Sequence, residues 1–162
     1  MIKTMKSIKR VNFEDCDPFS HLNNAIYLNY FLTAREEQLR SNDVLNIFEH
    51  VKATGNSWVV TSHNIRYLKP SVLGEELEIW SRMLSFNRFM NLVEFAMICP
   101  KKKQLKAVMH SEFAYFSIKK AKPVALDEQI LNLFKKISLF PGENMSVFNI
   151  NDRIKQIKTA IS

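Results

Sequence analysis

The chain has 162 residues, of which 46% are hydrophobic and 24% are charged. This length fits one globular domain with a sizeable core, and the composition excludes collagen, coiled coils and disordered chains. The formal net charge of +7 at pH 7 favours nucleic acids, acidic protein surfaces or phosphate-bearing small molecules as partners.

Several classes of site and segment are excluded by residue spacing. The three glycines, Gly55, Gly74 and Gly142, lie too far apart to form a phosphate-binding loop. Cys16 and Cys99 show no spacing typical of a zinc site or a disulfide framework. No stretch reads as a membrane span or a secretory signal, so we expect a cytoplasmic protein.

The first predicted elements are a strand and a buried helix. Alternating residues predict a short strand over 8–13, which the polar run 14–20 ends. From residue 22 to about 40 the apolar side chains cover nearly the whole circumference of a helix, which predicts burial. Because the turns over 35–40 are polar, we expect the N-terminal half of this helix to be the buried part.

Long strands rich in β-branched and aromatic residues follow an uncertain segment over 41–56. Their short connections predict consecutive antiparallel hairpins, turning at 69–74, 87–88 and 100–103. In the third strand, alternate residues from Phe89 to Cys99 form a core-facing side that Asn91 alone interrupts. The predicted strands cover 58–68, 75–86, 89–99 and 105–118.

The C-terminal part is predicted to be helical. Asp127 is placed as the cap of a helix that runs to Ile137, and a second short amphipathic pattern covers 151–161. We therefore expect one domain over 1–137 and an extension over 138–162 whose role the pattern does not assign.

These elements predict an α+β fold in which an antiparallel sheet wraps around one long central helix. A single small sheet curled around one helix leaves a broad face and free edges to cover. We therefore expect a homo-oligomer, either a dimer or a tetramer.

The densest group of reactive side chains is the run from Asp15 to Asn24, where carboxylates, an imidazole and amides lie together. Here the sequence resembles the hotdog-fold thioesterases of the 4-hydroxybenzoyl-CoA thioesterase type, and the motif is also similar to plant acyl carrier protein thioesterases. The resemblance extends over residues 8–124. The matching motifs are Phe13-Glu14-Asp15-Cys16-Asp17-Pro18, His21-Leu22-Asn23-Asn24-Ala25-Ile26-Tyr27-Leu28, Ala34-Arg35, Tyr67-Leu68-Lys69-Pro70 and Gly74-Glu75-Glu76-Leu77.

The resemblance implies roles for two residues of this run. Asp17 falls on the family's catalytic carboxylate, and His21 falls on the histidine of the acyl carrier protein thioesterases. Those enzymes keep an asparagine between the two where this chain has Phe19, so their full catalytic set is absent.

Thioester hydrolysis needs few catalytic groups, because the leaving thiol has a pKa of about 8.5 and departs without a general acid. One carboxylate can therefore act as nucleophile or as the base that activates water. The oxyanion would be stabilised by free backbone N–H groups at the helix start, at Asn23, Asn24 and Ala25.

A structural interpretation of the same residues stays open. Asp17, Ser20 or Asn23 can serve only as a helix cap, and His21 only as a turn histidine. Without the resemblance we would favour that interpretation. No base at suitable spacing supports Cys16 as a nucleophile, and the strand residues His63 and His110 are expected to be structural.

The implied substrate is an acyl group on coenzyme A (CoA) or on acyl carrier protein, with no cofactor beyond the CoA or phosphopantetheine of the substrate and no metal. The basic residues Arg88, 101–103 and 119–122 are candidates to bind nucleotide phosphates or an acidic carrier. Candidate substrate-binding residues are Tyr27, Phe31, Tyr67 and Arg88.

Two other functions compete with hydrolysis. An enoyl-thioester hydratase or dehydratase on the same fold would need His21 as an essential acid or base beside Asp17. A non-catalytic acyl-binding or nucleic-acid-binding domain ranks last, because no basic helix with interleaved aromatics is present. We therefore do not expect nucleic acid as a partner.

Overall fold

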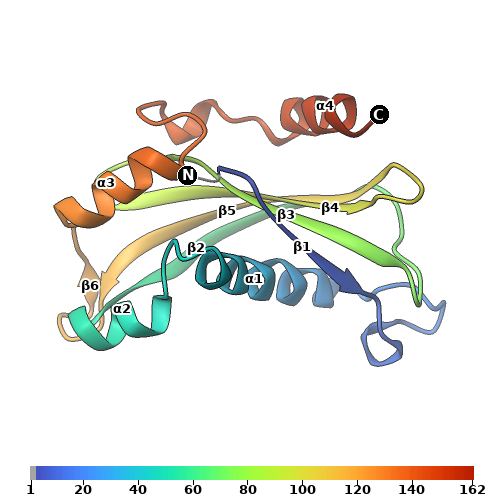
Figure 1. Ribbon diagram of the computed structural model, residues 1–162, viewed down its shortest axis with the longest axis horizontal. Helices are drawn as coiled ribbons and strands as arrows, with labels where there is room; N and C mark the ends of the chain where they lie inside the picture. The colour runs from blue at the N-terminus through green and yellow to red at the C-terminus, as the bar shows by residue number, and fades with distance from the viewer. Residues whose placement is uncertain (1–2) are drawn as a thin grey trace.

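A curved antiparallel sheet forms the centre of the structure, and helices lie on both of its faces (Figure 1). This computed structural model describes residues 3–162. The strands are β1 (Met5–Arg10), β2 (Asn56–Tyr67), β3 (Glu76–Phe86), β4 (Met90–Cys99), β5 (Gln104–Ser117) and β6 (Lys122–Pro123). The helices are α1 (Asn24–Ser41), α2 (Ile47–Thr54), α3 (Glu128–Ile137) and α4 (Ile150–Ile161), with single 3₁₀ turns over Phe13–Asp15 and Met145–Val147.

The strand order is β1-β3-β4-β5-β2, with β6 beside the end of β5. The predicted hairpins between β3 and β4 and between β4 and β5 are confirmed. The predicted hairpin over 69–74 is wrong, because β2 pairs with β5 and not with β3. On its other side β3 pairs with β1, and Met5 lies opposite Ser81. The segment after β2 therefore crosses the end of the sheet.

The first strand lies earlier in the chain than predicted. It covers Met5–Arg10 and not 8–13, and Phe13 stands in a 3₁₀ turn and is 80% exposed. The alternation that predicts a strand over 8–13 includes Phe13, an apolar residue that is mostly exposed and is not part of the core. Met5, which the prediction left out, is buried at the start of the strand.

The main core lies between α1 and the inner face of the sheet. The predicted core-facing side of β4 is confirmed from Val93 to Cys99, whereas Phe89 precedes the strand and is exposed. Phe31 of α1 packs against Phe95 with ring centroids 5.4 Å apart. Completely buried members of this core include Phe31, Leu77, Phe95, Met97, Ala107 and Met109.

Burial of α1 follows one face along its whole length, so the prediction that only its N-terminal half is buried is wrong. Gln38, in the last turns, donates from Nε2 to Ser7 Oγ at 2.8 Å and to the Ile79 carbonyl oxygen at 3.0 Å. Arg35 is also buried. These polar side chains are buried because strand atoms satisfy some of their hydrogen-bonding groups.

Two shorter helices flank the far end of α1. The segment left uncertain over 41–56 contains α2, which Asn46 caps and Gly55 ends with a left-handed φ of 70°. The predicted cap of α3 is confirmed, since Asp127 Oδ1 accepts a hydrogen bond from the Ile130 N–H at 2.9 Å.

The outer face of the sheet is covered by α4. Its residues Ile150, Ile154 and Ile157 are buried against β4 and β5. Both faces of β4 are therefore covered, one by α1 and the other by α4. No helix within residues 3–162 has the length and apolar character needed to cross a membrane.

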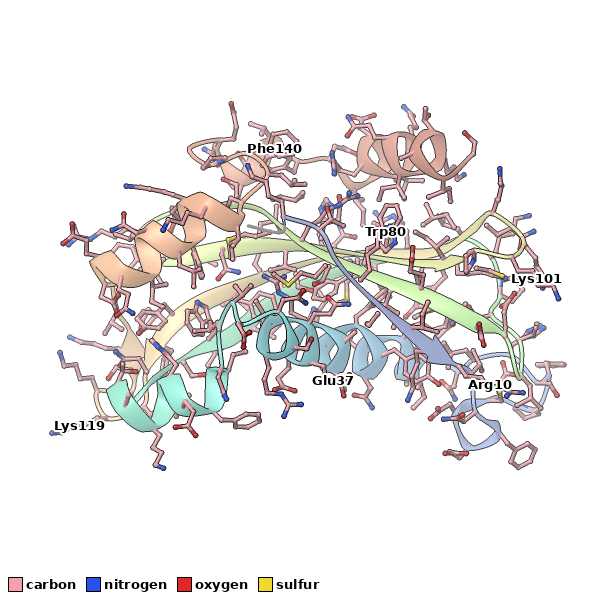
Figure 2. All side chains as sticks on the ribbon, viewed as in Figure 1. Arg10, Glu37, Trp80, Lys101, Lys119 and Phe140 are labelled. Carbon is pink, nitrogen blue, oxygen red and sulfur yellow. The ribbon has the colours of Figure 1, made fainter. Side chains whose placement is uncertain are left out.

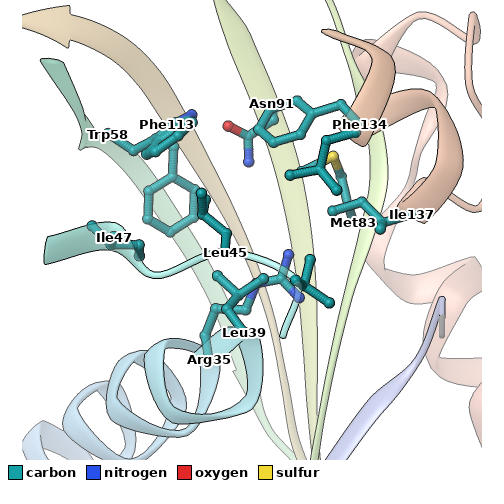
Figure 3. A pocket seen from close by; sticks show the side chains of 12 residues that line it. Arg35, Leu39, Leu45, Ile47, Trp58, Met83, Asn91, Phe113, Phe134 and Ile137 are labelled. Atoms are coloured by element: carbon teal, nitrogen blue, oxygen red, sulfur yellow. The ribbon is translucent and has the colours of Figure 1, made fainter. Parts of the chain in front are cut away.

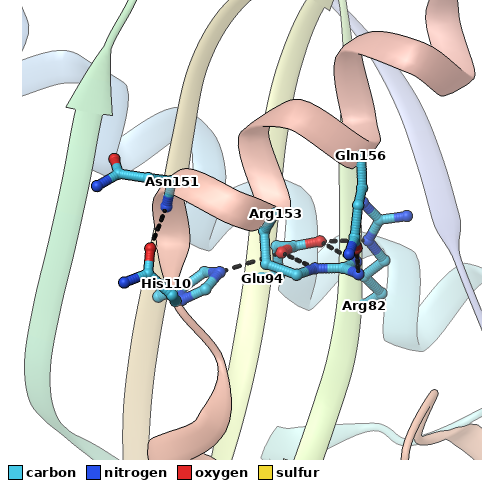
Figure 4. A network of polar contacts seen from close by, with 7 residues as sticks. Arg82, Glu94, His110, Asn151, Arg153 and Gln156 are labelled. Carbon is cyan, nitrogen blue, oxygen red and sulfur yellow. Dashed lines mark hydrogen bonds and ion pairs between the residues drawn. The ribbon is translucent and has the colours of Figure 1, made fainter.

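A buried ion-pair network fixes α4 to the sheet (Figure 4). Glu94 of β4 is completely buried and accepts hydrogen bonds from Arg82 at 2.6 Å and from Arg153 of α4 at 2.8 and 2.9 Å. His110 Nε2 lies 3.0 Å from the same carboxylate. Burial alone would raise the pKa of Glu94, but the hydrogen bonds and charges of Arg153, His110 and Arg82 outweigh it and lower the pKa to about 2.

The substitution Glu94→Gln should lower the free energy of unfolding at pH 7 by about 3 to 5 kcal/mol, because it leaves two buried guanidinium groups without their carboxylate. Since the pKa of Glu94 falls from its ordinary 4.5 to about 2, its contribution is complete above pH 4.5 and disappears toward pH 2. Urea unfolding of both proteins across this range measures the difference, which should shrink as pH falls.

Asp152→Asn on the same helix is the matched control, because its ion pair with Lys155 is exposed and should contribute less than about 1 kcal/mol. If the Glu94 and Asp152 variants lost the same free energy of unfolding at every pH, the assigned role of the network would be contradicted.

Candidate active site

The loop between β1 and α1 is closed by its own backbone. The N–H of Asp17 donates to the His21 carbonyl oxygen at 2.7 Å, and Ser20 adopts a left-handed φ of 60° inside this turn. The N–H of Leu22 donates to the Ser71 carbonyl oxygen at 2.8 Å. The loop is therefore tied to the segment that crosses from β2 to β3.

The two carboxylate oxygens of Asp17 have different environments. Its Oδ1 accepts hydrogen bonds from the N–H groups of Phe19 at 2.9 Å and His21 at 3.0 Å, an arrangement that fixes the carboxyl plane. Its Oδ2 has no hydrogen-bond partner within the described part of the chain. One oxygen is held by the turn and the other is available to a substrate or a water molecule.

A recess of about 260 Å³ lies beside this carboxylate. Its walls come from the loop, the first turns of α1, the end of β2 and the crossing segment. The structure thus brings together the predicted residues Asp17, His21, Asn24, Tyr27 and Tyr67. Its lining consists of Asp17, His21, Leu22, Asn24, Tyr27, Tyr67, Leu68, Lys69 and Pro70.

Two of the three predicted oxyanion donors are already engaged. The N–H of Asn23 donates to the Asp15 carbonyl oxygen at 2.9 Å, and the N–H of Ala25 donates to the capping oxygen Asn23 Oδ1 at 3.0 Å. The N–H of Asn24 has no partner among residues 3–162. As the first residue of α1, it also lies at the positive end of the helix dipole.

Two tyrosines connect the start of α1 to the end of β2 and to the crossing segment. Tyr67 donates to the Asn24 carbonyl oxygen at 3.1 Å, and its ring meets Tyr27 edge-on with centroids 5.1 Å apart. Tyr27 in turn donates to Ser71 Oγ at 3.2 Å. Partial burial and the neighbouring Tyr27 raise the pKa of Tyr67, so its hydroxyl group remains a protonated donor at neutral pH.

Other candidates lie away from the recess. Phe31 is completely buried in the core, and Arg88 lies in the turn after β3. The recess adjoins the start of β3, and a strand of 11 residues spans about 36 Å, so Arg88 is at the opposite end. Figure 2 likewise shows Lys101 near the Arg10 end of the molecule and Lys119 at the other, so the two lysine clusters are far apart.

His63, His110 and Cys16 have structural contacts. His63 Nδ1 lies 2.8 Å from Ser111 Oγ, and His110 belongs to the Glu94 network. Cys16 donates to the Asn12 carbonyl oxygen at 3.3 Å. Desolvation and the neighbouring carboxylates Asp17 and Asp15 raise its thiol pKa, which disfavours a reactive thiolate.

Lys69 also forms a wall of the recess, although the motif Tyr67-Leu68-Lys69-Pro70 alone does not predict this role. Beneath this segment, Lys106 donates to the Pro70 carbonyl oxygen at 2.9 Å and pairs with Glu75 at 3.0 Å. Burial would raise the pKa of Glu75, but Lys102 and Lys106 outweigh it and lower the pKa to about 2. This ion pair holds the segment in place.

Comparison with known proteins identifies the family. The family model of the thioesterase-like superfamily matches residues 11–134. The chain belongs to this superfamily. The predicted resemblance, the hotdog fold and the assignment as a thioester hydrolase are thereby confirmed.

Individual relatives agree with this assignment. The chain is 28% identical over 114 residues to the long-chain acyl-CoA thioesterase FadM of Escherichia coli K12, covering 70% of this chain and 84% of that protein. The structure of the probable thioesterase YbaW from Escherichia coli has a TM-score of 0.73 at 25% identity, covering 82% and 98% of the two chains. The DHNA-CoA thioesterase of Staphylococcus aureus shares the fold, with a TM-score of 0.76 at 18% identity and coverage of 85% and 91%.

Proposed function

We propose that this thioesterase hydrolyses acyl-CoA thioesters in the recess formed by Asp17, Asn24 and Tyr67. The observation that carries the proposal is that two residues lining one recess each have a polar group without a partner in the described chain, the Oδ2 of Asp17 and the N–H of Asn24 at the start of α1. The first supplies a nucleophile or a base, and the second supplies an oxyanion donor.

The proposed reaction places the thioester carbonyl oxygen on the N–H of Asn24. The Oδ2 of Asp17 then attacks the carbonyl carbon, or removes a proton from a water molecule that attacks it. The C–S bond breaks as the tetrahedral intermediate collapses, and the thiolate leaves without a general acid because thiols have a pKa of about 8.5. When Asp17 is the nucleophile, the acyl–Asp17 anhydride is then hydrolysed by a water molecule, which releases the free acid and restores the carboxylate. When Asp17 is the base, the collapse releases the free acid directly. His21, which also lines the recess, is assigned to positioning the substrate.

The choice of CoA as the carrier rests on the relative FadM and on basic residues beside the recess. A second hollow of about 270 Å³ shares Leu68 and Lys69 with the recess and is also lined by Lys103 and Lys158. Nucleotide phosphates of a bound CoA would meet these ammonium groups. Of the basic residues that the sequence offers as phosphate ligands, we therefore propose those of 101–103, and not Arg88 or 119–122.

Asp17→Asn should reduce thiol release from acyl-CoA thioesters at least a hundredfold. An asparagine Oδ1 can still accept from Phe19 and His21, so the turn should remain intact and the melting temperature nearly unchanged. A panel of short, medium, long and aromatic acyl-CoA esters measures the loss and the acyl range.

Glu14→Gln in the same loop is the control, because Glu14 is exposed and does not line the recess; it should retain full activity. Undiminished turnover in Asp17→Asn would contradict the proposed role of Asp17.

Replacing Lys103 and Lys158 by alanine should raise KM for an acyl-CoA about tenfold with little change in kcat, because the lysines bind phosphates far from the reacting carbon. The same acyl group on pantetheine, which lacks the nucleotide, should show no change. The control is the same pair of substitutions at Lys119 and Lys120, at the opposite end of the molecule. An equal effect on CoA and pantetheine esters would exclude this phosphate site.

We also propose that two copies of the chain pair along β2. This strand has 12 residues, most of them exposed, and its outer edge pairs with no strand in residues 3–162. Its exposed apolar side chains include Val59 and Val60. A long open edge of this kind is a template for strand pairing.

Native protein should sediment as a dimer or a larger assembly built from it, and Val60→Asp combined with Ser62→Asp should shift it toward monomer. On antiparallel strands these changes place like charges near each other. Because Tyr67 ends the same strand and lines the recess, activity should fall with the loss of assembly. A native monomer, or a variant that sediments like the native protein, would contradict pairing through β2.

A further inference from the structure

A buried positive charge lies at the far end of α1 from the recess. Arg35 is only 8% exposed, and Figure 3 shows its guanidinium group reaching into a pocket between Leu45 and Met83. Its Nη1 donates to Ser81 Oγ at 3.1 Å. Within residues 3–162 it forms no ion pair with a carboxylate, and its Nε and Nη2 donate to no acceptor.

The charge persists at neutral pH. Burial lowers the pKa of Arg35 to about 10, which still leaves the guanidinium group protonated at pH 7. A buried cation without a counter-charge is costly to a folded protein, and removing it is often neutral or stabilising. An unpaired buried arginine aimed into a cavity is therefore expected where a ligand supplies the negative charge.

Two further polar groups at this pocket have no partner. Asn91 is 4% exposed, and its Oδ1 accepts no hydrogen bond from the described residues. The buried indole Nε1 of Trp58 donates to no acceptor in the same part of the chain. Figure 3 shows both side chains on the wall of the pocket that also holds Arg35. Asn91 Oδ1 is an acceptor and would not bind an anion, but an N–H of Trp58 and several N–H groups of Arg35 are available to an anionic acceptor.

The rest of the pocket is apolar and small. Its walls include Leu39, Val44, Leu45, Met83 and Phe134, and its volume is about 60 Å³. One water molecule needs about 10 to 15 Å³ on this measure, so the pocket has room for about four waters, or an acid of about four carbon atoms. An alkyl group would pack against these apolar side chains and would bury no polar group of the wall.

We propose that this pocket is a second ligand site, which binds a short-chain aliphatic carboxylate. The carboxylate would lie on the guanidinium group of Arg35 with the Trp58 indole N–H beside it, and the alkyl chain would pack against Leu39 and Met83. Arg35 lies 11 residues after Asn24, or about 16 Å along the helix, so the site is separate from the recess.

The pocket adjoins a larger groove on the surface. A groove of about 550 Å³ runs between α2 and α3 and shares Val44, Leu45 and Leu133 with the pocket. These three aliphatic side chains form the wall between the two spaces. Rotation of such side chains would admit a small acid without moving the backbone.

Titration of sodium butanoate into the full chain tests the site by calorimetry and by tryptophan fluorescence, since Trp58 lines the pocket and Trp80 packs on the α4 side of the sheet. Native protein should bind butanoate saturably at one site per chain. Butanamide, which has nearly the same shape but no charge, should not bind. Arg35→Met should weaken butanoate binding at least tenfold, whereas Arg40→Met on the exposed face of the same helix should not.

Leu45→Trp is the second variant, because it fills the pocket and leaves Arg35 in place; it should also abolish binding, even if Arg35→Met fails to fold. Asp17→Asn should bind butanoate like the native protein, so this test is independent of the proposed hydrolysis. Absence of saturable binding to the native chain, or binding that survives in both pocket variants, would overturn the proposal.

Discussion

The packing of α1 across the inner face of the sheet is the constraint on which the other features depend. Phe31 and Phe95 meet at its centre, and Gln38 fixes its last turns to β1 and β3. With the helix held along its length, its first residue lies at one end of the sheet and Arg35 lies deep toward the other. The helix therefore sets the positions of both the recess and the second pocket.

The recess depends on topology as well as on the helix. Because β2 pairs with β5 and not with β3, the chain after Tyr67 must cross the end of the sheet, where it meets the loop that carries Asp17. The hydrogen bond from Leu22 to Ser71 joins the two segments. One short stretch of sequence thus supplies both the carboxylate of Asp17 and the start of α1. The opposite wall of the recess comes from Tyr67 to Pro70, more than 40 positions after Asn24.

The parts that the sequence predicted are those set by local chemistry. The cap at Asp127, the strands β3 to β5 and the reactive run around Asp17 and His21 follow from turn, alternation and motif patterns. Tertiary contacts decided the rest. Hydropathy could not place Gln38 in the interior, since it is buried by hydrogen bonds to strands that only the fold brings near. Among Asn23, Asn24 and Ala25, only the N–H of Asn24 has no partner within residues 3–162, because the side chain of Asn23 caps the helix and accepts from Ala25. The sequence allows this cap but does not require it.

The proposed polarisation of the substrate carbonyl by the N–H of Asn24 can be measured directly. The infrared stretching frequency of a ¹³C-labelled thioester carbonyl, bound to the Asp17→Asn variant so that it is not hydrolysed, reports hydrogen bonding to its oxygen. Hydrogen bonding to the Asn24 N–H should shift the carbonyl band clearly to lower frequency relative to the free ester in water. A bound ester whose carbonyl frequency equals or exceeds that of the free ester would contradict an oxyanion site at the start of α1.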